Sequence, residues 1–229
     1  MGFNEKVHAY LAARYYVRLT DRFGERGKAA FIQATQRYAE QRGRRMAQRA
    51  IRDGQPLTFA TYLRYGEWVN SEEATALGCA NNSEVLATGR DYVKRVTVCP
   101  WHTQFAEMGL TDAGEEYCRH LDNSICRGFN PYLDYRVPQT LHRSPCCIHI
   151  VRDANPGPGP WKKDPKNLRG FDYHCGHSYW TYREVAAAIF GKEGEEVADG
   201  VLEDFTETYG PEMAETLQSY RDTDFDRCD

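Results

Sequence analysis

A strand followed directly by a helix at residues 92–108 restricts how this chain can fold more than any other stretch. Residues 92–98 alternate in polarity and are rich in β-branched side chains, which predicts a strand. Pro100 fits the first turn of a helix that we expect to run to about Met108. The Cys99 thiol would then lie at a helix N-terminus, where main-chain N–H groups and the helix dipole favour a thiolate. The alternative for a single cysteine is a small buried hydrophobe.

A second predicted helix places a carboxylate on its apolar face. Residues 115–127 follow Thr111-Asp112, a pattern typical of a capped helix start. At about 100° per residue, Asp122 falls on the same side as Cys118. A carboxylate that faces a core is costly unless it is paired, hydrogen-bonded or protonated. Asp122 is therefore either a structural hydrogen-bond acceptor near the turn at 128–131, or an acid, base or ligand in a pocket shared with thiols, where burial would raise its pKa.

The hydrophobic pattern of the whole chain predicts an α+β fold. Its expected sheet is small and antiparallel, with four to five strands and helices packed on one face. The expected strands are residues 74–79, 84–88, 92–98, 132–141 and 146–151. The expected helices outside the central region are residues 4–23, 25–52, 57–69 and 181–191, followed by two more of which the last begins at Pro211.

Four regions follow from this pattern, and we expect them to form one compact unit. They are an N-terminal helical region 1–70, an α+β core 71–152 that carries the site, a Pro/Gly-rich loop and possible lid 153–180, and acidic C-terminal helices 181–229. Residues 193–229 hold thirteen acids and two bases, whereas one side of the helix 25–52 is rich in arginine. These two segments could pack together or across a homo-oligomer; otherwise the arginine face is solvated.

Composition excludes several classes of protein. The net charge of −4 argues against general nucleic-acid binding, and no run of about 18 apolar residues predicts a membrane helix. The charged residues among the first 20 leave no apolar core for a signal peptide. Eight cysteines without an export signal are better interpreted as reduced thiols than as disulfides, so we expect a cytoplasmic protein.

Metal binding is one use for these thiols. Zinc needs three or four Cys, His or carboxylate ligands in tetrahedral geometry, and no cysteine pair here has CxxC spacing. We therefore expect no cofactor. The alternative is a zinc-dependent hydrolase in which Cys99, Cys147 and Asp122 hold the metal and metal-bound water attacks. The candidate ligand groups are Cys99 with His102, Cys118 with Asp122, Cys147 with His149, and His174, Cys175 and His177.

Nucleophilic catalysis by cysteine is the other use. It needs a thiolate, a proton shuttle and donors for the developing negative charge. Cys99, Asp122 and the main-chain N–H groups after Cys99 could supply all three. Cys147 adds a second thiol if its strand runs beside the strand that precedes Cys99, and either cysteine could be the nucleophile.

Three motifs in this region resemble the L-2-amino-thiazoline-4-carboxylic acid hydrolase family. The resemblance implies hydrolytic opening of a small cyclic amidine or amide at a ring carbon–nitrogen bond. It carries over four positions, Cys99, Asp122, Asn130 and Cys147, and implies an aromatic residue where this chain has His149. The motifs are Cys99-Pro100-Trp101 before a helix, Asp122 separated by five residues from Gly128-Phe129-Asn130-Pro131, and Gln139-Thr140-Leu141 shortly before Cys147.

The sequence therefore predicts a hydrolase acting on a small molecule. Cys99 attacks an sp² ring carbon, Asp122 passes the proton to the leaving nitrogen, water resolves the covalent intermediate, and Cys147 assists or exchanges roles with Cys99. A non-catalytic, thiol-rich module that binds a ligand or metal is the alternative outside catalysis. The expected substrate contacts are His102, Cys118, Asn130, His149, His174 and His177. The last two could instead cap the following helix.

Overall fold

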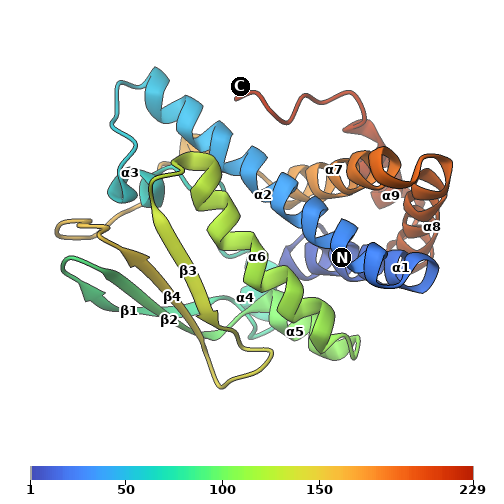
Figure 1. Ribbon diagram of the computed structural model, residues 1–229, viewed down its shortest axis with the longest axis horizontal. Helices are drawn as coiled ribbons and strands as arrows, with labels where there is room; N and C mark the ends of the chain where they lie inside the picture. The colour runs from blue at the N-terminus through green and yellow to red at the C-terminus, as the bar shows by residue number, and fades with distance from the viewer. Residues whose placement is uncertain (1, 229) are drawn as a thin grey trace.

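The computed structural model describes residues 2–228 and has the expected α+β fold, with an antiparallel sheet on one side and helices on the other (Figure 1). None of the helices in this part of the chain is long and apolar enough to cross a membrane. The elements are α1 (Glu5–Phe23), α2 (Glu25–Arg52), α3 (Phe59–Arg64), α4 (Glu72–Ala76), β1 (Asn82–Thr88), β2 (Tyr92–Val98), α5 (Pro100–Glu107), α6 (Thr111–Phe129), β3 (Asp134–Gln139), β4 (Cys147–Arg152), α7 (Phe171–Phe190), α8 (Lys192–Tyr209) and α9 (Pro211–Ser219).

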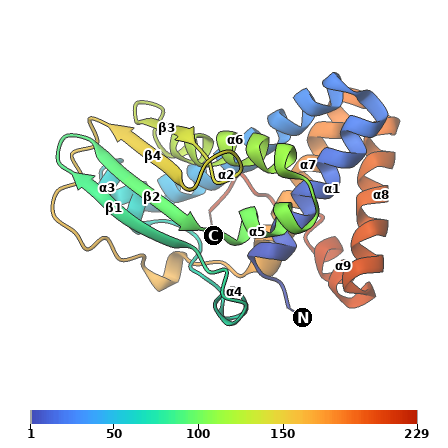
Figure 2. The same cartoon turned by 90° about the horizontal axis from the view of Figure 1, so that it is seen from below.

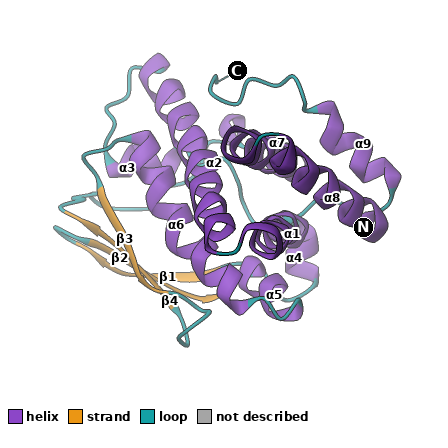
Figure 3. Cartoon of the chain, turned by 45° about the vertical axis from the view of Figure 1, so that its right-hand side comes forward, coloured by secondary structure: helices purple, strands orange, loops and turns teal. Residues whose placement is uncertain are grey.

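The sheet places side chains from β2 and β4 on one inner face. Its strand order within residues 2–228 is β1-β2-β4-β3, and every neighbouring pair is antiparallel. Lys94 of β2 lies opposite His149 of β4, and Val96 lies opposite Cys147. Alternate residues of a strand share a face, so these four side chains point to the same side of the sheet. Helices cover that side (Figure 3).

Helix α6 lies between the sheet and α2 (Figure 3), and two glycines let α2 and α6 approach closely. A Cβ atom at Gly43 of α2 would lie 2.0 Å from the carbonyl oxygen of Ile125. A Cβ atom at Gly128 of α6 would lie 2.3 Å from the carbonyl oxygen of Glu40. No larger residue fits without moving a helix. This contact therefore sets the position of α6, which carries two of the predicted site residues.

The N- and C-terminal helices form a bundle at the other end of the molecule from the sheet (Figure 2). Helices α1, α2, α7 and α8 bury aromatic residues from all four elements in one core. The Tyr15 hydroxyl donates a 2.9 Å hydrogen bond to the Tyr179 carbonyl, and Tyr182 lies 2.6 Å from the Thr35 hydroxyl. The hydroxyl groups of Tyr15 and Tyr182 thus have partners inside the bundle, as buried polar groups usually do.

The acidic C-terminal region packs on arginines of the same chain, as one of the two sequence interpretations predicts. Asp226 accepts a 2.6 Å hydrogen bond from Arg37 of α2. Asp204 of α8 pairs with Arg14 and Arg18 of α1, at 2.7 Å for each pair. Acidic side chains of the C-terminal region therefore pair with arginines of both α1 and α2.

Three arginines of α2 correct the expectation of a solvated basic face. Arg42, Arg45 and Arg49 are buried and converge on Glu67, which is fully buried. Burial alone raises the pKa of Glu67, but Arg45, Arg42 and Arg49 together lower it to about 2. Arg45 also donates a 2.6 Å hydrogen bond to the main-chain carbonyl of Phe225 near the C-terminus. These three arginines therefore belong to a buried ion cluster and not to a solvated surface.

Two predicted elements are wrong. Residues 74–79 do not form a strand, because Ser71 caps the short helix α4 by accepting a 3.0 Å hydrogen bond from the Ala74 amide. Helix α7 begins at Phe171 and not at Thr181, because tertiary packing buries His174 and His177 of its first turns, each with a polar partner. Helix α6 also lacks the predicted side-chain cap. The other expected strands and helices are present, with ends that differ by a few residues.

Candidate active site

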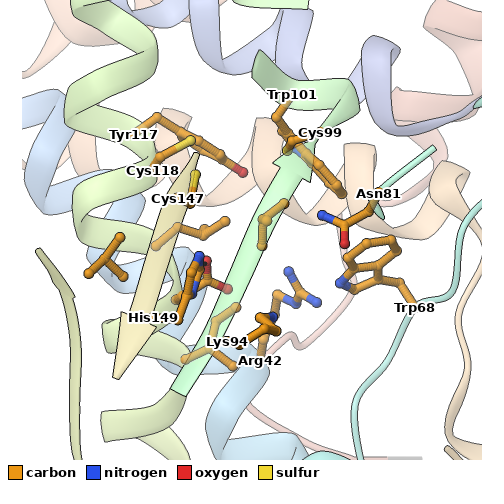
Figure 4. Close-up of a pocket in the computed structure, with 15 residues that line it drawn as sticks. Arg42, Trp68, Asn81, Lys94, Cys99, Trp101, Tyr117, Cys118, Cys147 and His149 are labelled. Carbon is orange, nitrogen blue, oxygen red and sulfur yellow. Dashed lines mark ion pairs between the residues drawn. The ribbon is translucent and has the colours of Figure 1, made fainter. Parts of the chain in front are cut away.

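A cavity of about 100 Å³ lies between the inner face of the sheet, the start of α5 and one face of α6. Its lining includes three thiols, Cys99, Cys118 and Cys147, together with Asp122 and His149. Figure 4 shows Cys118 and Cys147 turning their sulfur atoms toward each other, with Cys99 nearby at the end of β2. Residues that are up to 50 positions apart in sequence thus meet in one small space.

Cys99 is the N-cap residue of α5 and Pro100 occupies the first turn, as the sequence predicts. Burial raises the pKa of the Cys99 thiol to about 11, although the main-chain amides of His102 and Trp101 oppose the shift. The expectation that the helix start favours a resting thiolate is therefore wrong. Desolvation of the charged sulfur outweighs the helix N-terminus at this position.

The other two thiols are also protonated at neutral pH. Cys147 lies on the inner face of β4, where its sulfur accepts a 3.1 Å hydrogen bond from the Leu141 amide. Burial nevertheless raises the Cys147 pKa to about 12. For Cys118, burial and then the neighbouring Cys99 and Cys147 raise the pKa well above its ordinary value. Attack by any of these thiols therefore requires a base that accepts its proton.

Asp122 lines the cavity, and its charge contributes to the raised pKa of all three thiols. Its side chain is 37% exposed and lies 3.8 Å from Nδ1 of His149. The Tyr135 hydroxyl is 2.7 Å from the same nitrogen, and burial lowers the His149 pKa to about 4, so this imidazole is neutral at pH 7. Within residues 2–228, no hydrogen bond ties Asp122 to the turn at 128–131. Asn130 holds that turn instead, by accepting from the Tyr132 amide.

A second cavity of about 170 Å³ adjoins the first, and Asp122, Lys94 and Arg42 line both. Lys163 enters it from the loop 153–170, with its ammonium 4.9 Å from the centre of the Trp68 ring and donating to the Trp68 carbonyl. Burial, followed by Arg42 and Lys94, lowers the Lys163 pKa to about 8. Three cationic side chains therefore line this cavity together with the carboxylates of Asp122 and Glu67.

Arg42 adds an unused donor to this arrangement. Its Nε is buried and has no hydrogen-bond partner among the residues that the structure describes, and it lies 3.6 Å from the Glu67 carboxylate. Arg45 and Arg49 already bind Glu67 at 3.0 and 2.8 Å. The shared part of the two cavities thus has more positive than negative charge, which suits an anionic group on a ligand.

The model of the L-2-amino-thiazoline-4-carboxylic acid hydrolase family matches residues 4–148 of the chain. The chain belongs to this family. No curated protein and no solved structure was found to match it. The matched part contains Cys99, Cys118, Asp122 and Cys147, whereas Lys163 and helices α7–α9 lie beyond it. Membership of this hydrolase family supports the assignment of the chain as a hydrolase.

Three of the residues that were predicted to contact the substrate lie outside both cavities. Asn130 is the C-cap residue of α6, and its side chain donates a 2.7 Å hydrogen bond to the Leu57 carbonyl. His177 of α7 is buried beside Gln41 at 2.9 Å, and His174 lies 3.3 Å from the Glu67 carbonyl. These three residues have structural partners, so their predicted role as substrate contacts is not supported. They neither close the pocket nor cap α7.

His102 does not line the thiol cavity of this hydrolase either. It lies on α5 against His142, a residue that the sequence reasoning missed. Arg42, Lys94 and Lys163 were missed as well. Their side chains reach the site from a long helix, a strand and a loop, and no short motif connects them. Cys118 and His149, by contrast, line the cavity as expected of substrate contacts.

The zinc alternative lacks a preformed ligand set. Across residues 2–228, no group of three or more His, Cys, Asp or Glu side chains is arranged to hold a metal ion. Cys99, Cys147 and Asp122 share a cavity without converging on one point.

Proposed function

We propose that this protein is a cysteine-dependent hydrolase that opens a small cyclic amidine or cyclic amide at a ring carbon–nitrogen bond. The observation that carries the proposal is that Cys99, Asp122 and Cys147, far apart in sequence, line one cavity of about 100 Å³. That volume suits a single small ring. Substrates of the expected type are a 2-amino-thiazoline carboxylate, a lactam or a cyclic urea.

In the proposed mechanism, Cys99 is the nucleophile and Asp122 moves the proton. Because the thiol pKa is about 11, the S–H proton passes to the Asp122 carboxylate as sulfur attacks the sp² ring carbon. Asp122 then protonates the ring nitrogen as the carbon–nitrogen bond breaks. Main-chain amides at the start of α5 stabilise negative charge that develops next to Cys99.

Water completes the reaction. For a cyclic amide the intermediate is a thioester on Cys99, and water adds to its carbonyl carbon. The carbon–sulfur bond breaks, one proton of the water returns to sulfur, and the ring-opened acid leaves. Cys147, whose sulfur already accepts a hydrogen bond from the Leu141 amide, assists or exchanges roles with Cys99.

The cationic side chains support a substrate that carries a carboxylate. Arg42, Lys94 and Lys163 line the second cavity, next to Asp122. A substrate whose ring lies among the thiols can direct a carboxylate toward these three groups, where charge-assisted hydrogen bonds form.

A substrate panel with matched variants tests the proposal. Small lactams, cyclic ureas and cyclic amidines are offered to the wild type and to the variants Cys99→Ala, Asp122→Asn and Cys147→Ala. We expect ring opening by the wild type, with kcat/KM reduced by about 10³-fold or more in Cys99→Ala and by about 10²-fold or more in Asp122→Asn. Circular dichroism checks that each variant is folded.

Cys146→Ala is the control, because Cys146 neighbours Cys147 but contacts Gln139 at 3.2 Å outside the cavity lining. It should retain wild-type turnover. Full activity in Cys99→Ala would reject Cys99 as the nucleophile. Binding of the same compounds without any ring opening would favour the non-catalytic binding module.

A further inference from the structure

Two imidazoles connect the thiol cavity with helix α5. The sulfur of Cys118 lies 3.4 Å from Nε2 of His142, and Nδ1 of His142 lies 3.4 Å from Nδ1 of His102. His142 belongs to the segment between β3 and β4 and is 7% exposed. His102 is on the first turn of α5 and is more exposed. The proposed mechanism uses none of these contacts.

We propose that Cys118 is a second nucleophilic thiol of the cavity, with His142 as its base and His102 as the acceptor of the proton from His142. This inference rests on the proposed function, since it adds a residue that can attack the same cyclic amidine or amide. Cys118 lines the cavity beside Cys99 and Cys147, so its sulfur and theirs face the same bound ring.

The hydrogen-bond geometry fits one set of tautomers. A neutral histidine has one ring N–H donor and one ring acceptor. If Nε2 of His142 accepts the Cys118 S–H, then Nδ1 of His142 carries a proton and donates it to Nδ1 of His102. Burial lowers the His142 pKa to about 4 and also lowers the His102 pKa, so both rings are neutral at pH 7. Every member of the chain then has its partner.

The transfer balances without another reactant. The S–H bond of Cys118 breaks as an N–H bond forms at Nε2 of His142. The N–H bond at Nδ1 of His142 breaks as an N–H bond forms at Nδ1 of His102. The result is a thiolate at Cys118, a neutral His142 in its other tautomer, and an imidazolium at His102. The positive charge thus forms on the more exposed ring of His102 and not inside the desolvated cavity.

The surroundings of His142 hold its ring in place. A Cβ atom at Gly114 of α6 would lie 2.2 Å from Cε1 of His142, so the ring packs directly against the helix main chain. The Phe105 ring of α5 lies edge-on to it at 5.8 Å. The charged and titratable groups that face His142 are His102 of α5, Glu115 and Cys118 of α6, and Arg143 of its own segment. Of these, Glu115 favours the protonated ring, whereas His102 and Arg143 oppose it.

Alkylation of Cys118 tests the relay without any substrate. The protein is treated with iodoacetamide at pH values from 6 to 10, and the rate at each cysteine is followed by mass spectrometry of peptides. In His142→Phe we expect the Cys118 rate at pH 7 to fall at least about tenfold, because the thiol has lost its base. His102→Phe should give a smaller loss and shift the pH profile of Cys118 upward. The rate at Cys146 should stay unchanged in both.

A second pair of variants keeps the test valid if His142→Phe does not fold. Gly114→Ala pushes the His142 ring away without removing it and should also slow alkylation of Cys118. Gly89→Ala is its control, because a Cβ atom at Gly89 meets no atom within 4 Å. An unchanged Cys118 rate in folded Gly114→Ala or His142→Phe protein would overturn the relay.

The two proposals fail separately. Slower Cys118 alkylation in His142→Phe protein supports the relay even if no compound in the panel is hydrolysed, which would count against the proposed function alone. If Cys99→Ala abolishes turnover but the Cys118 alkylation rate is the same in His142→Phe as in the wild type, the proposed function is supported and Cys118 is rejected as a second nucleophile. In an active enzyme, Cys118→Ala should lower kcat.

Discussion

Lys163 is the residue whose chemistry depends most on its surroundings. Its ammonium is buried against the Trp68 ring and carbonyl and shares a cavity with Arg42 and Lys94. Burial, followed by the two neighbouring cations, lowers its pKa to about 8. An anion bound in this cavity would favour the charged ammonium and raise that pKa again. Lys163 is therefore suited to recognising an acid group on the substrate.

Lys163→Met tests this recognition. For a carboxylated substrate, we expect KM to rise by about 10- to 100-fold with a smaller effect on kcat, because one charge-assisted hydrogen bond is lost. The carboxamide analogue of the same substrate should show no such rise. Steady-state kinetics with both compounds give the comparison.

Lys162→Met is the control for the Lys163 variant, since Lys162 is the exposed neighbour on the same loop. It should leave KM unchanged. An equal rise in KM for the acid and its amide would contradict a charge-based role for Lys163 and indicate a change in cavity shape instead.

At the residue scale, local sequence patterns predicted where side chains lie better than they predicted the pKa values of those side chains. Periodicity predicted the face of α6 on which Asp122 lies. The strand followed by Pro100 predicted that Cys99 lies at the start of a helix. The Cys99 pKa depends on how much protein covers the sulfur, which no local pattern encodes. His142 was missed for a related reason, because its partners come from α5 and α6.

At the scale of elements, the contact between α2 and α6 positions the site. Gly43 and Gly128 bring the two helix axes together, and α6 then presents Cys118 and Asp122 to the inner face of the sheet. Both glycines stand inside helices, where alanine would ordinarily be favoured by about 1 kcal/mol. Close packing of the two main chains outweighs that preference here.

Gly43→Ala should therefore destabilise the protein despite the higher helix propensity of alanine. The added methyl meets the Ile125 carbonyl, so α6 must shift, and overpacking of this kind costs about 1–3 kcal/mol. We expect a lower urea midpoint and reduced turnover, since Cys118 and Asp122 move with α6. Gly89→Ala, in open space, serves as the control. A midpoint equal to or above that of the wild type would show that α6 accommodates the methyl group.

The elements that sequence predicted best are those with strong local signals. Helices α1 and α2 and strand β2 have clear periodicity and distinct ends, and their predicted bounds are correct except that α1 begins one residue later, at Glu5. Helix α4 has five residues, too few for periodicity to distinguish it from a strand. The start of α7 was missed because His174, Cys175 and His177 look like a polar site in sequence, whereas tertiary packing buries them.

At the scale of the whole molecule, buried ionisable groups link stability to pH. Burial lowers the pKa of His142 and His149 to about 4 and that of His174 to about 3, below the ordinary value of 6.5. The unfolded chain therefore binds protons below pH 6.5 that the folded chain does not. Glu67, held at a pKa of about 2 instead of 4.5, acts in the same direction at lower pH.

Stability should accordingly be greatest above pH 6.5 and fall as the pH drops toward 4, by up to about 1.4 kcal/mol per pH unit for each buried histidine. The contribution of Glu67 should be lost between about pH 4.5 and 2. Urea unfolding at a series of pH values measures both slopes. His174→Asn should flatten the first slope. A free energy of unfolding that stays constant between pH 7 and 5 would contradict this account.

The hydrogen bond from Arg45 to the Phe225 carbonyl links the C-terminal segment to the ion cluster around Glu67. The Phe225 ring also stacks on His177, with the ring centres 4.4 Å apart. A protease cut just before this residue would leave a buried guanidinium one acceptor short and open the aromatic stack to water. The segment thus stabilises the ion cluster whose carboxylate, Glu67, lines the second cavity, and a purification tag is better attached at the N-terminus.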